Sequence, residues 1–349
     1  MSAAGAQRIL FVRLSALGDV INTLPALEAL RSGRPDAHIG YLVEDRAYDL
    51  IRNHPAVSQV HLYPRKRWVA MFRNPAEWWQ ALREIRGFVS ELRGARYELA
   101  LNFQSNLKGA LMCLLSGAPR RLGFGPANSK EHSHLFNHEN VAPAGGELIN
   151  RVEKFIALAA AAGGSAAGAQ YRLPEAPESR ARVRQWLDEQ ALREYVVLHP
   201  GTSDFGAQKR WPPQRFAAVA AQLGRERKLP IVVSWGPGEK PLAEQIAAGS
   251  EGQARIALET RNVLDLAELI RGARLFIGCD SGPLHLASAA GTPSVALFGP
   301  KDPRTYAPWN PRSRVVQKGQ NWGRMDDIMV EDVVGAAGGL LDESARPQR

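Results

Sequence analysis

The residues best placed to bind an anion lie in the segment CDSGPLHLASAAGTPSVALFGP, residues 279–300. An apolar run ends at Cys279 and Asp280, and small helix-forming residues follow as far as Gly291. This order predicts a strand, a tight turn, a helix and a second strand, with Pro283 in the first turn of the helix and Gly291 just past its end. Backbone N–H groups at such a helix start are unpaired and lie at the positive end of the helix dipole. The segment therefore predicts a turn that binds phosphate groups.

Asp19 is an acidic candidate in the loop SALGD, which follows the first strand-like run. Ligands of open α/β sheets bind at the carboxyl ends of the strands, so this carboxylate is well placed to act on a substrate. Aspartate also caps amphipathic helices frequently, and the pattern alone favours that structural role. The loop lacks a GxGxxG fingerprint, which argues against a dinucleotide site here.

The segment HPGTSDFGAQKRWPP, residues 199–213, places two adjacent cations, Lys209 and Arg210, in a polar loop after another strand-like run. A fixed lysine in such a loop can stabilise the charge that develops on a departing diphosphate. The structural alternative is a solvated pair of cations beside the buried side chain of Trp211. If the context of the surrounding polar loop is left aside, the solvated pair is the favoured interpretation of Lys209 and Arg210.

Two further polar side chains lie near predicted helix starts. Glu239, in WGPGEKP, could accept hydrogen bonds from ribose hydroxyls, or it could lie in the first turn of the next helix because the dipole favours a carboxylate there. His285 follows Pro283 on an apolar helix, where a lone histidine is more often a structural hydrogen-bonding group, although its place near the helix start favours contact with a ligand. No HExxH, paired DxD or Cys/His cluster is present, so we expect no metal site.

The elements that must position these residues alternate between strand and helix patterns. In the first half, apolar runs predict strands at 9–12, 38–44, 59–63 and 97–104, and helical spacing predicts helices at 20–30 and 76–93. In the second half, short apolar runs predict five strands at 195–201, 230–236, 254–258, 274–280 and 293–299. The alternation predicts an α/β fold of two doubly wound domains, 1–170 and 171–349, that face a central cleft.

The composition excludes several classes of protein. With 349 residues, 45% apolar and 23% charged, the chain has material for two folded domains and is not disordered as a whole. The net charge of +9 implies an anionic partner, which could be nucleic acid, a membrane surface or a phosphorylated substrate. No apolar run is long enough to span a bilayer, and Cys113 and Cys279 form no CxxC pair, so a reducing, cytoplasmic setting is expected.

Residues 61–96 carry eight Arg and Lys against three Glu, a surplus of five that is more than half of the net charge. Five apolar side chains of this segment follow helical spacing and are expected in the core: Trp78, Leu82, Ile85, Val89 and Leu92. The preceding PRKRWVAMF lacks that spacing, and a basic segment with apolar residues is attracted to an anionic lipid surface. Nucleic acid is the competing partner, but no recognised nucleic-acid-binding module supports it.

In combination, these segments resemble the ADP-heptose:lipopolysaccharide heptosyltransferases, inverting glycosyltransferases of the GT-B type with two Rossmann-like domains. The resemblance runs from RLSALGDVINTLPAL through NFQSNLKGAL, RRLGFG, HPGTSDFGAQKRWP and WGPGE to the segment at 279–300. SKEHSHLFNHENV is more similar to the heptosyltransferase I branch, whereas FGAQKRWP is also similar to heptosyltransferase II. The resemblance changes the preferred role of Asp19 from helix cap to catalyst.

The resemblance assigns roles to particular residues. It implies that Asp19 is the general base and that Lys209 contacts the nucleotide diphosphate as it leaves. It implies a donor site made of Thr202, Lys209, Glu239, Asp280, Ser281, Gly282, Pro283 and His285. It implies an acceptor site with cations at Arg65, Lys66, Arg67, Arg120 and Arg121.

The implied reaction is transfer of heptose from ADP-heptose to the lipopolysaccharide inner core, either Kdo-lipid A or heptosyl-Kdo-lipid A, after domain closure. No metal or cofactor is expected. The implied partners are the nucleotide-sugar donor, the anionic acceptor and the cytoplasmic face of the inner membrane, with peripheral association and without nucleic acid. The alternatives are a related GT-B transferase that uses another nucleotide sugar, and a non-catalytic binder of a nucleotide or lipid headgroup.

Overall fold

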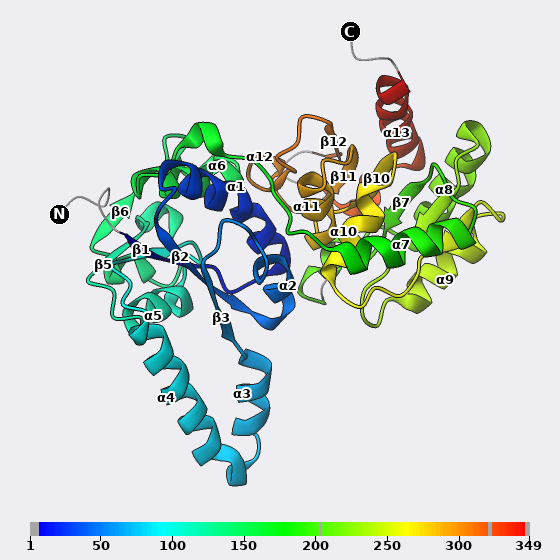
Figure 1. Cartoon of the computed structure of the whole chain (residues 1–349). Coiled ribbons are helices and arrows are strands. Elements are labelled where there is room, and N and C mark those ends of the chain that lie inside the picture. The colour runs from blue at the N-terminus through cyan, green and yellow to red at the C-terminus, as the bar shows by residue number, and fades with distance from the viewer. Residues whose placement is uncertain (1–6, 203, 320–322, 346–349) are drawn as a thin grey trace. The chain divides into compact units, whose positions relative to one another are not determined.

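The chain divides between Glu175 and Ala176 into two compact units. The computed structural model describes residues 7–202, 204–319 and 323–345. Each unit contains a six-stranded parallel sheet with helices packed around it (Figure 1). The two-domain α/β architecture expected from the sequence is confirmed.

The sheet of the first unit has the strand order β3-β2-β1-β4-β5-β6. Its strands are β1 (Arg8–Val12), β2 (His38–Glu44), β3 (Gln59–Tyr63), β4 (Leu99–Asn102), β5 (Arg120–Phe124) and β6 (Glu139–Val141). Its helices are α1 (Leu17–Gly33), α2 (Tyr48–Ile51), α3 (Arg65–Phe72), α4 (Trp78–Gly94), α5 (Leu107–Leu115) and α6 (Arg151–Ala161). Because β1 lies between β2 and β4, the connections turn in opposite directions on its two sides, and loops at this switch point form ligand sites in doubly wound sheets.

The sheet of the second unit has the order β12-β11-β10-β7-β8-β9, which is the same topology. Its strands are β7 (Val196–His199), β8 (Ile231–Val233), β9 (Ala254–Ile256), β10 (Leu275–Cys279), β11 (Ser294–Phe298) and β12 (Ser313–Gln317). Its helices are α7 (Pro177–Glu189), α8 (Pro213–Arg227), α9 (Lys240–Ala248), α10 (Val263–Arg271), α11 (Gly282–Ala289), α12 (Pro303–Tyr306) and α13 (Val330–Ala345). The switch point lies between β7 and β10.

The central strands form where the sequence has continuous apolar runs. Ile9 of β1 is fully buried and pairs with Ile39 of β2 and Leu99 of β4. Helices cover both faces of a parallel sheet, so its inner strands are apolar on both sides and are readily recognised. All nine strands expected from the sequence are confirmed, whereas β5, β6 and β12 were not expected.

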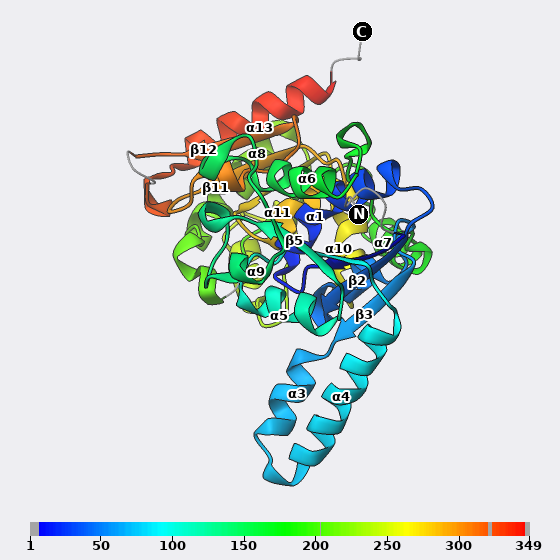
Figure 2. The same cartoon turned by 90° about the vertical axis from the view of Figure 1, so that its left-hand side faces the viewer.

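Helices α3 and α4 form a hairpin that projects from the sheet of the first unit (Figure 2). Trp68 and Met71 of α3 are buried against Ala81 of α4, although PRKRWVAMF lacks the spacing that would have predicted them in the core. The expectation for Trp78 and Leu82 is wrong, because their side chains are 49% and 50% exposed. They lie toward the tip of the hairpin, where α4 has no sheet beneath it, whereas Leu92 at its base is fully buried.

Candidate active site

Asp19 lies in the first turn of α1, directly after the switch-point strand β1. The Ala16 N–H donates a hydrogen bond to Asp19 Oδ2 over 3.4 Å, so the carboxylate does cap its own helix. It also forms ion pairs with Arg13, which follows β1, and with Arg151, the first residue of α6. The Asp19 carboxylate therefore caps α1 and also contacts two arginines outside that helix. Capping of α1 does not rule out a catalytic role for the same side chain.

The loop before Asp19 is held by side chains from the loop after β4 and from α5. The Leu14 and Ser15 N–H groups donate to Gln104 Oε1 over 3.0 and 3.2 Å. Lys108 Nζ donates to Ser15 Oγ over 3.3 Å and forms an ion pair with Glu44 at 2.6 Å. These contacts from α5 and from the loop after β4 fix the start of α1 at the carboxyl edge of the sheet.

The surroundings of Asp19 are strongly positive. Arg13 is only 6% exposed and donates to the Phe103 carbonyl over 2.5 Å. Lys154, on α6, lies 4.3 Å from the centroid of the Phe124 ring, and burial together with repulsion from nearby cations lowers its pKa to about 7. The sequence reasoning missed Arg13, Arg151 and Lys154, since nothing local in RVEKF indicates that this helix meets the end of β1.

In the second unit, Lys209, Asp280 and His285 form a cluster at the switch point between β7 and β10. Lys209 Nζ lies 2.7 Å from Asp280 Oδ2, and His285 Nε2 lies 3.7 Å from Asp280 Oδ1. Burial alone would raise the pKa of Asp280, but His285 and Lys209 together hold it below its usual value. The structure thus brings together three residues that the sequence placed in the donor site.

The N-terminus of α11 carries polar atoms without a partner. Ser281 is the N-cap residue, yet its side chain makes no capping hydrogen bond. Ser281 Oγ and His285 Nδ1 are buried and have no hydrogen-bond partner among the described residues. Gly282 and Pro283 form the first turn, and Gly291 has a φ of +74° just past the helix end, as expected. Unsatisfied buried groups at the positive end of a helix are suited to an anionic ligand.

Glu239 and Thr202 lie in the loops after β8 and β7. Glu239 Oε2 accepts a hydrogen bond from the Gly236 N–H over 2.9 Å, and a Cβ atom at Gly201 would overlap this carboxylate. Glu239 is the N-cap residue of α9, so the geometry is compatible with both of its predicted roles. Thr202 Oγ1 donates to the Gly206 carbonyl over 3.0 Å, which shapes the loop that carries Lys209.

The five cations predicted for the acceptor lie at two different edges of the first sheet. Arg65, Lys66 and Arg67 begin α3 directly after β3, at the carboxyl edge, and Arg65 and Lys66 line a shallow hollow of about 250 Å³. Arg120 and Arg121 begin β5, and Arg120 is in register with Leu99 at the start of β4. One strand length, about 13 Å for four residues, separates that edge from the one that holds Asp19. The structure does not bring Arg120 and Arg121 to Asp19.

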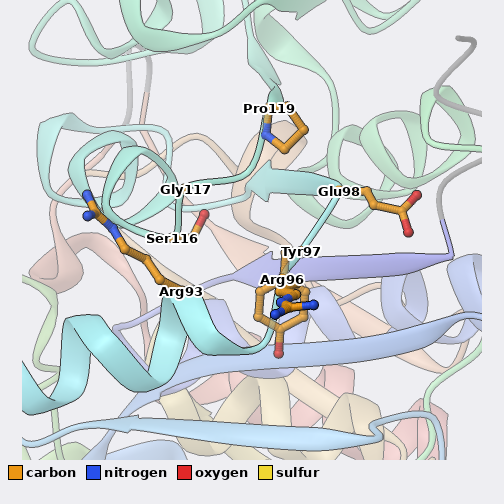
Figure 3. Close-up of a pocket in the computed structure, with 7 residues that line it drawn as sticks. All are labelled: Arg93, Arg96, Tyr97, Glu98, Ser116, Gly117 and Pro119. Atoms are coloured by element: carbon orange, nitrogen blue, oxygen red, sulfur yellow. The ribbon is translucent and has the colours of Figure 1, made fainter.

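Arg120 and Arg121 have structural partners at the amino edge. Arg120 forms an ion pair with Glu139, and Arg121 Nε donates to the Phe136 carbonyl over 2.8 Å. The larger hollow of about 540 Å³ lies at this edge too (Figure 3). It is lined by Arg93, Arg96, Tyr97, Glu98, Ser116, Gly117 and Pro119. Because ligands of such sheets bind at the carboxyl edge, this hollow is not the candidate site.

Within residues 7–202, 204–319 and 323–345, no group of three or more His, Cys, Asp or Glu side chains could hold a metal ion. Cys113 and Cys279 are free thiols, and burial raises the pKa of each to about 12. At neutral pH both are therefore protonated and unreactive.

Comparison with known proteins gives consistent matches. The model for glycosyltransferase family 9 (heptosyltransferase) matches residues 85–329. Lipopolysaccharide heptosyltransferase 1 of Pseudomonas aeruginosa is 30% identical over 302 residues, which cover 85% of this chain and 79% of that protein. The solved structure of a family 9 glycosyl transferase from Veillonella parvula has a TM-score of 0.79 at 23% identity and 97% coverage of both chains. The structure of E. coli heptosyltransferase WaaC with ADP has a TM-score of 0.76 at 22% identity, covering 97% of this chain and 100% of that one.

Proposed function

Because this chain belongs to glycosyltransferase family 9, the heptosyltransferase family, we propose that it transfers heptose from ADP-heptose to the lipopolysaccharide inner core. The similarity to a heptosyltransferase 1 favours Kdo-lipid A as the acceptor, with heptosyl-Kdo-lipid A as the alternative. The E. coli neighbour solved with ADP supports an adenine nucleotide in the donor. We propose that transfer proceeds with inversion and without a metal.

The observation that carries the proposal is the group of polar atoms at the start of α11. Lys209 Nζ, paired with Asp280, supplies a positive charge, and Ser281 Oγ and His285 Nδ1 are buried polar atoms with no partner among the described residues. A diphosphate would satisfy these groups and would also benefit from the positive end of the α11 dipole. Glu239, held beside Gly201, is placed to accept hydrogen bonds from the ribose.

The proposed mechanism is a single displacement. Asp19 removes the proton of the acceptor hydroxyl as that oxygen forms a bond to the anomeric carbon, and the bond from this carbon to the diphosphate breaks. ADP leaves with the bonding electron pair, and Lys209 and the N-terminus of α11 stabilise its charge. Asp19 belongs to the first unit and Lys209 to the second, so the proposed step uses residues of both units.

The direct test is incubation of the protein with ADP-heptose and Kdo-lipid A, with ADP release and acceptor mass as readouts. We expect ADP release that depends on the acceptor, and thermal stabilisation by ADP but not by UDP or GDP. A ligand present at 100 times its Kd stabilises by about 2.7 kcal/mol, which is readily measured. Release with a UDP- or GDP-sugar instead would favour the related transferase, and nucleotide binding without turnover would favour the non-catalytic binder.

Gly201→Ala is expected to weaken ADP binding about tenfold, which corresponds to about 1.4 kcal/mol. The new Cβ atom would overlap the Glu239 carboxylate and displace it from its position beside the ribose. Isothermal titration with ADP measures the effect. The control is Gly335→Ala on α13, where a Cβ atom meets nothing within 4 Å, and its ADP affinity should equal that of the wild type. Wild-type affinity in Gly201→Ala would contradict the role of Glu239.

We also propose that the protein is cytoplasmic and associates peripherally with the inner membrane. No helix among the described residues is both long and apolar enough to cross a bilayer. The tip of the α3 and α4 hairpin exposes Trp79 to 81% and Phe72 to 44%, and the hairpin also carries exposed cations such as Lys66 and Arg73. Exposed tryptophan beside basic side chains favours the surface of an anionic bilayer.

Trp79→Ala is expected to weaken binding to vesicles of phosphatidylethanolamine and phosphatidylglycerol about tenfold, because the exposed indole is lost from the interface. Vesicle flotation measures the bound fraction. The control is Leu135→Ala, which removes another apolar side chain of the first unit, 72% exposed but outside the hairpin. Equal losses in both variants, or none in Trp79→Ala, would contradict this assignment.

A further inference from the structure

The proposed base, Asp19, has a cation at each of its two oxygens. Arg13 pairs with Oδ2 and Arg151 pairs with Oδ1. A general base needs an oxygen within hydrogen-bond distance of the proton that it removes. Ion pairs stabilise the charged carboxylate and so oppose protonation. In this structure both Asp19 oxygens are paired with arginines, so the proposed base is held in a state that is less able to accept a proton.

The two arginines differ in their burial and in their place in the fold. The Arg13 side chain is 7% exposed, donates to the Phe103 carbonyl, and lies 5.4 Å from the centroid of the Phe155 ring. The Arg151 side chain is 27% exposed and belongs to the first residue of α6. A cation at a helix N-terminus is disfavoured by the helix dipole. We therefore expect that less free energy is needed to move Arg151 from Asp19 to another anion than to move Arg13.

The surroundings of Asp19 also carry more positive than negative charge. Lys154 lies on the same helix as Arg151, one turn away, and its Nζ donates to the Asn128 carbonyl over 2.8 Å. Burial, followed by repulsion from Arg151, Arg13 and Lys130, lowers the pKa of Lys154 to about 7, and attraction to Asp19 opposes this shift. A cluster of cations around one carboxylate favours binding of a second anion.

We infer that Arg13, Arg151 and Lys154 form the binding site for a carboxylate on the acceptor sugar, and that this carboxylate draws Arg151 away from Asp19. The inference rests on the proposed function, in which the acceptor sugar, Kdo, is an acid. Arg151 exchanges one carboxylate for another, and Asp19 Oδ1 becomes available to the acceptor hydroxyl. The base is then active only when the acceptor is in place, which limits wasteful transfer of heptose to water.

The test compares an acceptor with a free carboxylate and the same acceptor as its methyl ester, using wild type, Arg151→Gln and Arg151→Lys. A hydrogen bond between charged groups corresponds to about 10- to 100-fold in affinity. We expect wild type to favour the free acid by about that factor in kcat/KM, and Arg151→Gln to lose most of the preference. Arg151→Lys keeps the charge and should retain part of the preference. Arg151→Gln should also release ADP faster than wild type when water is the only acceptor.

The control is Arg52→Gln, which removes a surface ion pair with Asp49 in the same unit and should keep the wild-type preference for the acid. ADP binding and thermal unfolding report whether each variant is folded. Equal use of acid and ester by wild type, or an unchanged preference in folded Arg151→Gln, would overturn the inference while leaving heptose transfer in place. Absence of transfer by wild type to either acceptor would instead overturn the proposed function.

Discussion

Asp19→Asn is expected to lower the rate of heptose transfer about 1,000-fold, within the range that general base catalysis contributes. The amide keeps the size of the side chain and one oxygen, but it cannot take the proton of the acceptor hydroxyl. The donor groups at the start of α11 belong to the other unit and are unchanged, so ADP affinity should equal that of the wild type. Acceptor-dependent ADP release and isothermal titration with ADP measure the two quantities separately.

The stability of Asp19→Asn must be measured, because Arg13 is buried and loses its charged partner. We expect the free energy of unfolding to fall by about 1 to 3 kcal/mol, less than for a fully buried pair because the Asp19 carboxylate is 21% exposed. Asp49→Asn, which removes a surface pair with Arg52, is the matched control and should remain fully active. Substantial transfer by folded Asp19→Asn would exclude Asp19 as the base.

The parts of the fold that could be predicted are those fixed by local pattern. Strands such as β1 and β10 are continuous apolar runs because helices cover both faces of a parallel sheet. The turn before α11 was recognisable because Pro283 and Gly291 mark the two ends of that helix. Asp19, Lys209 and Asp280 could be placed near strand ends because they lie in the segments that follow β1, β7 and β10.

The parts that could not be predicted depend on contacts that the sequence pattern does not record. The edge strand β6 has three residues, none of them buried, so it has no apolar run to recognise. The contact between Arg151 and Asp19 joins residues 132 positions apart. Trp78 and Leu82 have the spacing of a buried helix face, but spacing does not reveal that the tip of the hairpin lacks a sheet to cover them.

Arg120 illustrates a different difficulty. It is a cation in a segment, RRLGFG, that carries the family resemblance, yet the register of β5 places it at the amino edge of the sheet. Which edge a residue occupies depends on where its strand begins, and the sequence pattern did not reveal β5. The structural pairing of Arg120 with Glu139 accounts for this arginine without a substrate.

Lys209→Ala is expected to lower kcat about 100- to 1,000-fold, because a preorganised charge on the departing diphosphate is lost. The same change should weaken ADP binding about tenfold, since the buried Asp280 carboxylate, now without its lysine, repels the diphosphate. These two effects can be separated by adding Asp280→Asn. The double variant should recover most of the ADP affinity but not kcat, because removing the repulsion does not restore the charge that the transition state needs. Titration with ADP and steady-state kinetics provide the two readouts.

Lys240→Ala is the matched control, because it removes a cation of the same unit that is 57% exposed and pairs only weakly, at 3.9 Å, with Glu244. It should leave both kcat and ADP affinity unchanged. If Lys209→Ala lost ADP affinity but kept kcat, Lys209 would bind the ground state and the transition state equally and would not stabilise the leaving group. If the double variant recovered kcat as well, the loss in Lys209→Ala would come from the unpaired Asp280, and the charge on ADP would have to be stabilised by the start of α11 alone.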